Sequence, residues 1–496
     1  MTADEARIIE LEAVVEAQRV LIERLEPLAE IVESQRRLIV KLEARVAELE
    51  RRLGQNSGNS GLPPSRDPVA ERQRQAEERA QKSSRTGGAK RRPGKQRGAR
   101  GSGLAMSATP DEIVDHHPDR CGRCQSDLDD ATETGFRARQ VIEVPEITPT
   151  VTEHRAHERR CGCGHLNKAS FPVGVRAPVS YGPRARAVIV YLLARQHLPG
   201  RRVAETMADL FGLNVSTGTI DSIYTQAARR LAGFIAALVA LLRTLPVLHA
   251  DETTDRIDTA TCWMHVVSTN LYTLIHASVT RGTDAIVDAG VLIGYQGVVV
   301  HDRLAMYWKL KAKHGLCGAH LLRDLADVAT VATQKGWATG LAGLLVEINA
   351  ACDDARARGH KRLAPLYQRA FAARYDTLVA QAAAANPDPA SGRKRDYLER
   401  RSHNLAVAFA THRRPILAYM YNLDIAFTNN QAERDLRPTK LHRKISGCFR
   451  SQHGAERFAH LRSYLSTTRK HDIPAIDALI RLFDDDPWMP PAPAAT

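Results

Sequence analysis

Two short apolar runs, each ending in an aspartate, constrain most strongly what this chain of 496 residues can fold into. The runs span 245–251 and 297–302, and both have the length and apolar content of a buried β-strand. The same kind of pattern predicts further strands at 262–268 and 271–279. A β-sheet is therefore expected in the second half of the chain.

A long helical stretch separates this sheet from the end of the chain. Residues 316–423 are predicted to be mainly helical, and further helices close the chain from about 430 to 484. This order matches a ribonuclease-H-like α/β core that is interrupted by a helical insertion. We expect a multidomain α+β protein, with the core at 244–484 and a tail at 485–496.

Three carboxylates fall at notable places in this core. Asp251 and Asp302 end the two apolar runs, and Glu433 lies at the start of a predicted helix, which Asn429 and Asn430 are expected to cap. Mg²⁺ prefers oxygen ligands, and two such ions about 3.5–4 Å apart can hold the attacking and leaving oxygens of a phosphoryl transfer. The three residues therefore predict a catalytic site that holds two Mg²⁺ or Mn²⁺ ions.

Ordinary structural roles are also open to these carboxylates. An aspartate at a strand end is commonly a turn former or a helix cap. Glu433 shares a helix face with Arg437 at i+4, so a salt bridge would also explain it. Asp251 is preferred to Glu252 because successive strand residues point to opposite faces, and Asp251 ends the apolar run.

Positive charge is concentrated in two places that suit phosphate binding. The net charge is +14, residues 81–100 contain no acid, and a dense basic run follows Glu433. The predicted DNA contacts are Lys90, Arg91, Arg92, Lys95, Arg97, Asn430, Arg437, Lys440, Arg443 and Lys444. A solvated linker and a solvated helix face are the alternatives.

The N-terminal segment has the spacing of a coiled coil. Over 1–53 apolar residues recur at alternating steps of three and four, most regularly after Pro27. The pattern predicts a helix that joins two or more copies of the chain, whereas an amphipathic helix packed on its own domain is the alternative. Residues 54–110 are rich in Gly, Pro, Ser and Arg, and are predicted to form a flexible basic linker.

A compact cysteine-bearing module is predicted at 111–178. Its cysteines form two close pairs: Cys121, Cys124, Cys161 and Cys163. Strand-like segments near 139–144 and 150–157 separate the pairs, so four thiolates could bind one structural Zn²⁺ as in a zinc ribbon. Since the second pair is separated by only one residue, unliganded cysteines are the alternative, and His157 or His165 could replace a ligand.

Residues 179–243 are predicted to form a helical DNA-binding region. Helical segments on either side of 211–216, with a glycine in the turn and Ser216 as a cap, suggest a helix-turn-helix. Helix pairs with such turns also occur in proteins that do not bind DNA.

Cys317-Gly-Ala-His320 follows the second aspartate at the head of a predicted helix. The two side chains could bind a metal ion, but with only two ligands visible a packed cysteine and a hydrogen-bonded histidine are preferred. They are therefore predicted to have a structural role beside the site.

Targeting signals are not evident in the sequence. No apolar run approaches the roughly 18–20 residues of a membrane span, and residues 1–7 do not resemble a secretory signal. The expected location is the cytoplasm, in association with the nucleoid.

Several of these motifs together resemble the transposases of the insertion sequence sixty-six family. The resemblance covers nearly the whole chain and includes 56–65, 91–96, the four-cysteine module and the segments around Asp251, Asp302 and Cys317. The most specific similarity runs from Phe427 to 450 and continues over 462–470. Ala426, where a proline is common, and the close spacing of the second cysteine pair are the departures.

The resemblance implies a DNA transposase of a bacterial insertion sequence, with Asp251, Asp302 and Glu433 as catalytic residues. Such an enzyme binds terminal inverted repeats, cleaves DNA and joins the freed end to target DNA. A non-catalytic DNA-binding regulator and a structure-selective nuclease are the competing hypotheses. Expected partners are double-stranded DNA, a second copy of the chain and accessory transposition proteins.

Overall fold

The computed structural model describes residues 104–172, 174–175, 177–388 and 395–492, together with residues 14–16, 18–19, 35 and 39, which are helical and exposed. The chain divides into two units, Met1–Glu143 and Val144–Thr496. Apart from these few residues, the predicted coiled coil lies outside the described residues, as does nearly all of the predicted linker.

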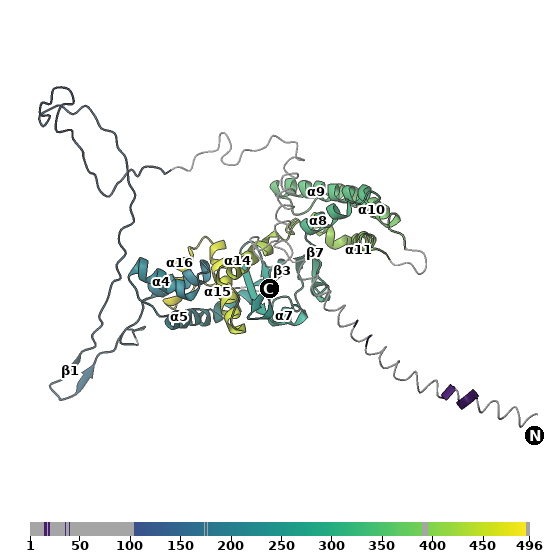
Figure 1. Ribbon diagram of the computed structural model, residues 1–496, viewed down its shortest axis with the longest axis horizontal. Coiled ribbons are helices and arrows are strands. Elements are labelled where there is room, and N and C mark those ends of the chain that lie inside the picture. Colours follow the sequence, from purple (N-terminus) through teal and green to yellow (C-terminus); the bar gives the residue numbers. More distant parts are fainter. Residues whose placement is uncertain are drawn as a thin grey trace, which may run out of the picture. The chain divides into compact units, whose positions relative to one another are not determined.

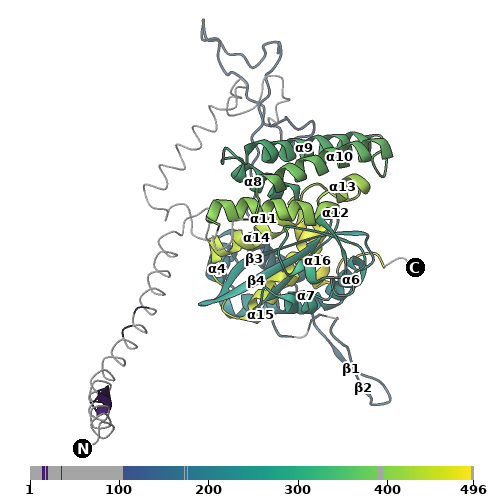
Figure 2. The same ribbon diagram turned by 90° about the vertical axis from the view of Figure 1, so that its right-hand side faces the viewer.

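A five-stranded mixed sheet lies at the centre of the second unit (Figure 2). Its strands are β3 (Val247–Ile257), β4 (Ala260–Ser268), β5 (Thr273–Ser278), β6 (Val298–His301) and β7 (Lys313–Leu316). The order across the sheet is β5-β4-β3-β6-β7. Strands β3, β4 and β5 pair antiparallel, whereas β6 is parallel to both β3 and β7.

Two features of this sheet differ from the sequence prediction. Asp251 does not end its strand, because β3 continues to Ile257 and pairs with β4 along that length. The polar residues beyond Asp251 join the strand because the antiparallel partner satisfies their backbone groups. Strand β7 was not predicted, since four residues that include Gly315 carry too little pattern.

Helices before the sheet form the first hydrophobic core with one of its faces. They are α3 (Pro183–Val190), α4 (Gly200–Phe211), α5 (Thr217–Arg230) and α6 (Ala232–Leu242), with a π-helical turn η2 (Tyr191–Arg195) after α3. Their apolar faces pack against β3 residues such as Leu248 and Ala250, and against the C-terminal helices.

The turn between α4 and α5 follows from its residues. Gly212 ends α4 with φ of 63°, a left-handed conformation that glycine adopts without a Cβ clash. Ser216 begins α5 by accepting a hydrogen bond from the backbone N–H of Thr219.

Helices between β7 and Glu433 form a second core, together with sheet residues such as Val300 of β6 and Leu316 of β7. Helix α9 runs beside α10, as Figures 1 and 2 show. The helices of this region are α8 (Gly318–Val328), α9 (Lys335–Ala357), α10 (Pro365–Ala384), α11 (Tyr397–Thr411), α12 (Arg413–Ile416) and α13 (Ala418–Tyr421). They occupy the span for which the helical insertion is predicted.

The last helices of the chain pack on the sheet and cover its β5 edge. Helix α14 (Asn430–Ser446) places Ala432 and Leu436 in a third core with β4 and β5. Helix α15 (Gln452–Lys470) covers the outer edge of β5, where Ser463 accepts a hydrogen bond from Ile275 N at 2.8 Å. Capping the edge with side chains prevents pairing with another strand. Helix α16 (Ala475–Phe483) packs into the first core, and the short α7 (Thr283–Asp288) lies between β5 and β6 in sequence.

The strands predicted near 139–144 and 150–157 are absent, and this prediction was wrong. Val141, Val144 and Val151 are exposed, so no core fixes a strand there. A hairpin of β1 (Glu158–Arg160) and β2 (Leu166–Lys168) forms instead.

No single helix of the described residues is long and apolar enough to cross a membrane; only the bent pair α5 and α6, taken together, reaches that length and composition.

Candidate functional site

The two predicted catalytic aspartates lie on neighbouring strands. His249 of β3 pairs with Val300 of β6 in parallel register. Asp251 and Asp302 each follow that pair by two residues. Their backbones therefore occupy corresponding positions on neighbouring segments of the chain, which lie about 4.8 Å apart in a sheet. The carboxylate of Asp302 accepts a hydrogen bond from the backbone N–H of Leu304 at 3.0 Å, which fixes the turn after β6.

The electrostatics of Asp251 reflect a cluster of like charges. Burial first, and then the negative charges of Glu252, Asp302 and Glu433, together raise the pKa of Asp251 to about 7, although a hydrogen bond from the backbone N–H of Glu252 opposes the shift. Neither Asp251 nor Asp302 forms an ion pair with a cationic side chain in the described ranges. Several carboxylates that lie close together without a cationic side chain repel one another. A divalent metal ion would neutralise this charge, so the cluster suits metal binding.

The Glu252 carboxylate interacts with residues outside the aspartate site. Its carboxylate accepts a hydrogen bond from Tyr307 Oη at 2.9 Å and pairs with Arg281 at 2.8 Å. Tyr307 belongs to the core beneath the sheet together with Leu248 and Ala250, which alternate with Asp251 along β3. Glu252 therefore points to the face of the sheet opposite to that of Asp251.

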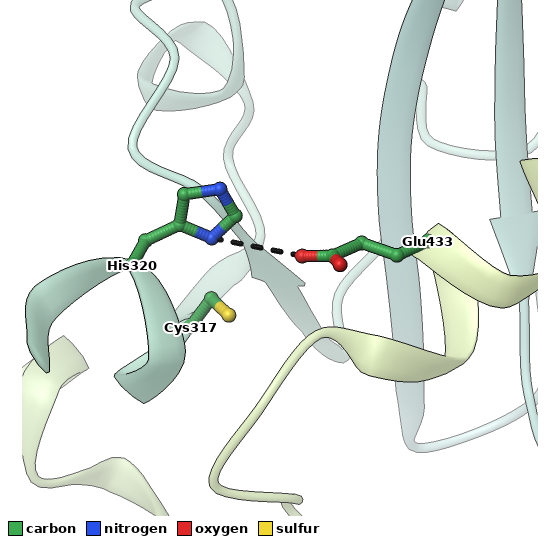
Figure 3. Close-up of side chains that lie close together, drawn as sticks. All are labelled: Cys317, His320 and Glu433. Carbon is green, nitrogen blue, oxygen red and sulfur yellow. Dashed lines mark ion pairs between the residues drawn. The ribbon is translucent and has the colours of Figure 1, made fainter. Parts of the chain in front are cut away.

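Glu433 lies in the first turn of α14, where the helix N-terminus favours a negative charge. The salt bridge to Arg437 considered from the sequence is not seen. The carboxylate instead lies 3.8 Å from Nδ1 of His320, as Figure 3 shows. Because α14 packs on β3 and β4, Glu433 is held close enough for its charge to act on Asp251.

The side chain of Asn429 connects the start of α14 to the strand that carries Asp251. Asn429 is 1% exposed, donates a hydrogen bond from Nδ2 to the carbonyl of Ala250 at 2.8 Å, and lies 3.0 Å through Oδ1 from Nδ1 of His249. Its backbone N–H donates to Cys317 Sγ at 3.1 Å. The prediction that Asn429 caps its helix through the side chain was wrong, since the amide bonds to β3 instead.

The segment before Asn429 is also fixed on α8. The backbone N–H of Gly318 donates to the carbonyl of Phe427 at 2.7 Å. A Cβ on Gly318 would lie 2.2 Å from the Phe427 ring, so only glycine allows this contact. Residues 427–429 therefore join β3, α8 and α14 at one point.

Cys317 and His320 lie at this junction. Cys317 is buried at the N-terminus of α8, and His320 is one turn along the helix. The ligand atoms of Cys317, His320 and Glu433 all lie within 4.8 Å of one another. The pKa of His320 is raised, chiefly by its interaction with the Cys317 side chain.

Comparison with known families covers most of the chain. The profile of the "Transposase IS66 family" matches residues 178–457, which is more than half of the sequence. The chain belongs to the IS66 family of transposases. The profile of the "zinc-finger binding domain of transposase IS66" matches 118–164, and a family of unknown function matches 4–104. A search of curated proteins found no match.

Membership of this family identifies the protein as a DNA-binding transposase with a zinc-finger domain. All three candidate catalytic carboxylates, and Cys317 and His320 as well, fall inside the transposase match. The zinc-finger match contains both cysteine pairs.

Each cysteine pair of the zinc-finger domain sits in a tight turn. Cys121 accepts a backbone hydrogen bond from Gln125, and Cys161 accepts one from Gly164. A hydrogen bond with Ser126 lowers the pKa of Cys124 to about 7, and the backbone of Cys163 lowers the pKa of Cys161. Lowered thiol pKa values favour the thiolate, which is the form that binds zinc. The first pair lies in the first unit and the second pair in the second unit.

A basic face runs along α14 of the transposase. Asn430, Arg437, Lys440 and Lys444 are exposed and share one side of the helix, whereas Arg443 is partly buried. Within the described residues, none of Arg437, Lys440 and Lys444 forms an ion pair. The other predicted DNA contacts, from Lys90 to Arg97, lie outside the described residues.

Sequence reasoning did not foresee the hydrogen bonds of the Asn429 side chain to β3, or the role of the histidines that precede the aspartates. His249 and His301 are both buried, and His301 Nε2 lies 3.1 Å from His314 Nδ1. A histidine at the end of each apolar run was the available signal, because a buried polar residue requires a partner.

Proposed function

We propose that this transposase cuts and joins DNA through Asp251, Asp302 and Glu433, in a ribonuclease-H-like core. The observation that carries the proposal is the parallel register of β3 and β6, which places the backbones of Asp251 and Asp302 at corresponding positions. Glu433, which lies on helix α14, is close enough for its charge to act on Asp251.

The reaction consists of two in-line displacements at phosphorus. Water attacks a phosphodiester at the element's end, the bond to the 3′-oxygen breaks, and a free 3′-hydroxyl is left. That hydroxyl then attacks a target phosphodiester, forms a new bond to phosphorus and releases a 3′-hydroxyl of the target strand. Two Mg²⁺ or Mn²⁺ ions, when bound, would supply charge stabilisation and activation of the attacking oxygen.

The protein's own contribution is positioning. Asp251 lies in β3 and Asp302 directly follows β6, so the parallel pairing of these two strands sets the separation of the two aspartates. Glu433 is held by Asn429, whose hydrogen bonds connect the start of α14 to β3. Groups fixed in this way lose little freedom when substrate binds, which lowers the barrier to an in-line attack.

DNA is bound, on this proposal, by several modules. The α4–α5 pair acts as a helix-turn-helix, since its capped second helix presents Thr217, Asp221 and Ser222 to solvent. The four cysteines hold one structural Zn²⁺, and the basic face of α14 contacts phosphates near the cleaved bond. A coiled coil at 1–53 pairs two copies of the chain on the two element ends. Accessory transposition proteins complete the complex, which works on the nucleoid in the cytoplasm.

The experiment that tests this proposal compares wild type with Glu433→Gln on DNA that carries the element's own ends. Cleavage and strand transfer are measured with Mg²⁺ and with EDTA, and DNA binding is measured in parallel. We expect Glu433→Gln to bind DNA as wild type does but to lose at least about 100-fold in cleavage, as removal of a key charge-stabilising group commonly does.

Glu347→Gln is the matched control. Glu347 is an exposed glutamate on α9 and pairs with Arg374 of α10, not with a residue of the candidate site. It should cleave like wild type. If wild type binds the ends and does not cleave in Mg²⁺, the catalytic proposal fails for the protein acting alone. A DNA-binding regulator, or dependence on an accessory protein, would then explain the chain. Cleavage without joining, by a monomer, would indicate a nuclease.

A further inference from the structure

Three side chains beside the candidate catalytic site form a ligand set that differs chemically from the carboxylates. Cys317, His320 and Glu433 offer a sulfur, an imidazole nitrogen and a carboxylate oxygen, all within 4.8 Å of one another (Figure 3). They come from two elements, α8 and the first turn of α14.

The distances suit a shared ion better than direct bonding. His320 Nδ1 lies 3.8 Å from Glu433 Oε1, which exceeds hydrogen-bonding distance. Two ligands at zinc-bond lengths of about 2.0–2.1 Å in a tetrahedron lie about 3.3–3.4 Å apart. A shift of roughly half an ångström would therefore allow both atoms to bind one ion.

The imidazole nitrogen that faces Glu433 lacks a hydrogen-bond partner. Within the described residues, His320 Nδ1 is buried and forms no hydrogen bond. A buried polar atom without a partner is costly, and a metal ion would satisfy it.

The sulfur is prepared for ligation as well. Cys317 Sγ accepts the backbone N–H of Asn429 at 3.1 Å and lies at the N-terminus of an eleven-residue helix. The hydrogen bond holds the sulfur in place within the cluster. The His320 and Glu433 side chains keep 29% and 34% of their exposure, so an ion can enter from solvent and a fourth ligand position stays open.

We propose that Cys317, His320 and Glu433 form a Zn²⁺ site that draws Glu433 away from Asp251 and Asp302. Thiolate and imidazole ligands select Zn²⁺ over Mg²⁺. Binding of Zn²⁺ is independent of the proposed reaction, whereas the inhibition that follows from it rests on the proposed function. Since one carboxylate serves both sites, zinc and catalysis exclude each other.

The binding experiment titrates metal-free, full-length protein with Co²⁺, whose bond to a thiolate is seen by near-ultraviolet absorption. Wild type is compared with Cys317→Ser and His320→Ala. Cys448→Ser is the control, because Cys448 is an exposed cysteine outside the cluster. Circular dichroism establishes that each variant is folded.

We expect wild type and Cys448→Ser to bind one equivalent of Co²⁺ more than Cys317→Ser and His320→Ala do, and Zn²⁺ to displace it. His320→Ala keeps the thiol, so it tests the site even if Cys317→Ser fails to fold. Equal stoichiometry in wild type and His320→Ala would overturn the proposal.

The inhibition experiment adds Zn²⁺ to the Mg²⁺-dependent cleavage reaction of wild type whose zinc-finger domain is already loaded. We expect cleavage to fall at least tenfold and a zinc chelator to restore it. If Zn²⁺ binds at the site and DNA cleavage does not fall, the proposal that zinc binding excludes catalysis would be overturned. A wild type that never cleaves would refute the proposed function instead, and the Co²⁺ titration would still decide the binding site.

Discussion

Replacement of Asn429 by alanine should destabilise the protein through two lost hydrogen bonds. Asn429 Nδ2 donates to a carbonyl, which fixes the amide orientation, so Oδ1 faces His249 and Nδ1 of that histidine must carry the proton. In Asn429→Ala, the Ala250 carbonyl and His249 Nδ1 are left buried and unsatisfied. Each such group costs about 1–3 kcal/mol, so the expected loss is about 2–6 kcal/mol.

The assay is urea unfolding followed by circular dichroism. With a slope of about 3 kcal/mol/M, the unfolding midpoint should fall by about 1 M. Asn430→Ala is the matched control, because the neighbouring side chain is exposed. That control should stay within about 0.5 kcal/mol of wild type. Equal midpoints for the two variants would refute the hydrogen-bonded connection between α14 and β3.

Three further outcomes follow from the charges of the structure. The folded-state pKa of Asp251, about 7, lies above its ordinary value of 3.8, so its ionised form destabilises the metal-free protein above neutral pH. The urea midpoint in EDTA should therefore rise as pH falls from 8 toward 5, and Asp251→Asn should reduce that slope. Lys470, at the end of α15, pairs with the buried Asp435 of α14 at 2.7 Å, so Lys470→Met should cost about 3–5 kcal/mol in the same assay, and adding Asp435→Asn should recover much of it. Arg437→Ala combined with Lys440→Ala should weaken DNA binding and lower the salt-dependence slope by about 2 without changing stability, whereas an unchanged slope would exclude phosphate contact.

The sheet and helices around the carboxylates could be predicted because their patterns are local. The apolar runs before Asp251 and Asp302 have few alternatives to a buried strand, and the helix after Asn430 begins where the sequence indicates. Strand β7 could not be predicted, because its four residues are ordered by pairing with β6 rather than by their own propensity.

The organisation of the site depends on contacts between residues far apart in sequence. Asn429 looks like a helix cap, and only the fold reveals that its amide bonds to residues 179 and 180 positions earlier. Cys317 and His320 offered two ligands in the sequence, and the third, Glu433, lies more than 100 residues further on. Local spacing cannot identify such a set, since its members are separated by helices that pack on one another and on β6 and β7.

The most direct test of the catalytic account exchanges one oxygen ligand for sulfur. Asp302→Cys would place a soft thiolate where the account requires a metal ligand, and Mn²⁺ accepts sulfur more readily than Mg²⁺ does. Cleavage of DNA with the element's ends is measured in each metal for wild type, Asp302→Cys and Asp302→Asn. The account predicts that both variants lose Mg²⁺-supported cleavage and that the Mn²⁺-to-Mg²⁺ activity ratio of Asp302→Cys rises at least about tenfold above that of wild type. An unchanged ratio, or full Mg²⁺ activity in Asp302→Asn, would contradict it.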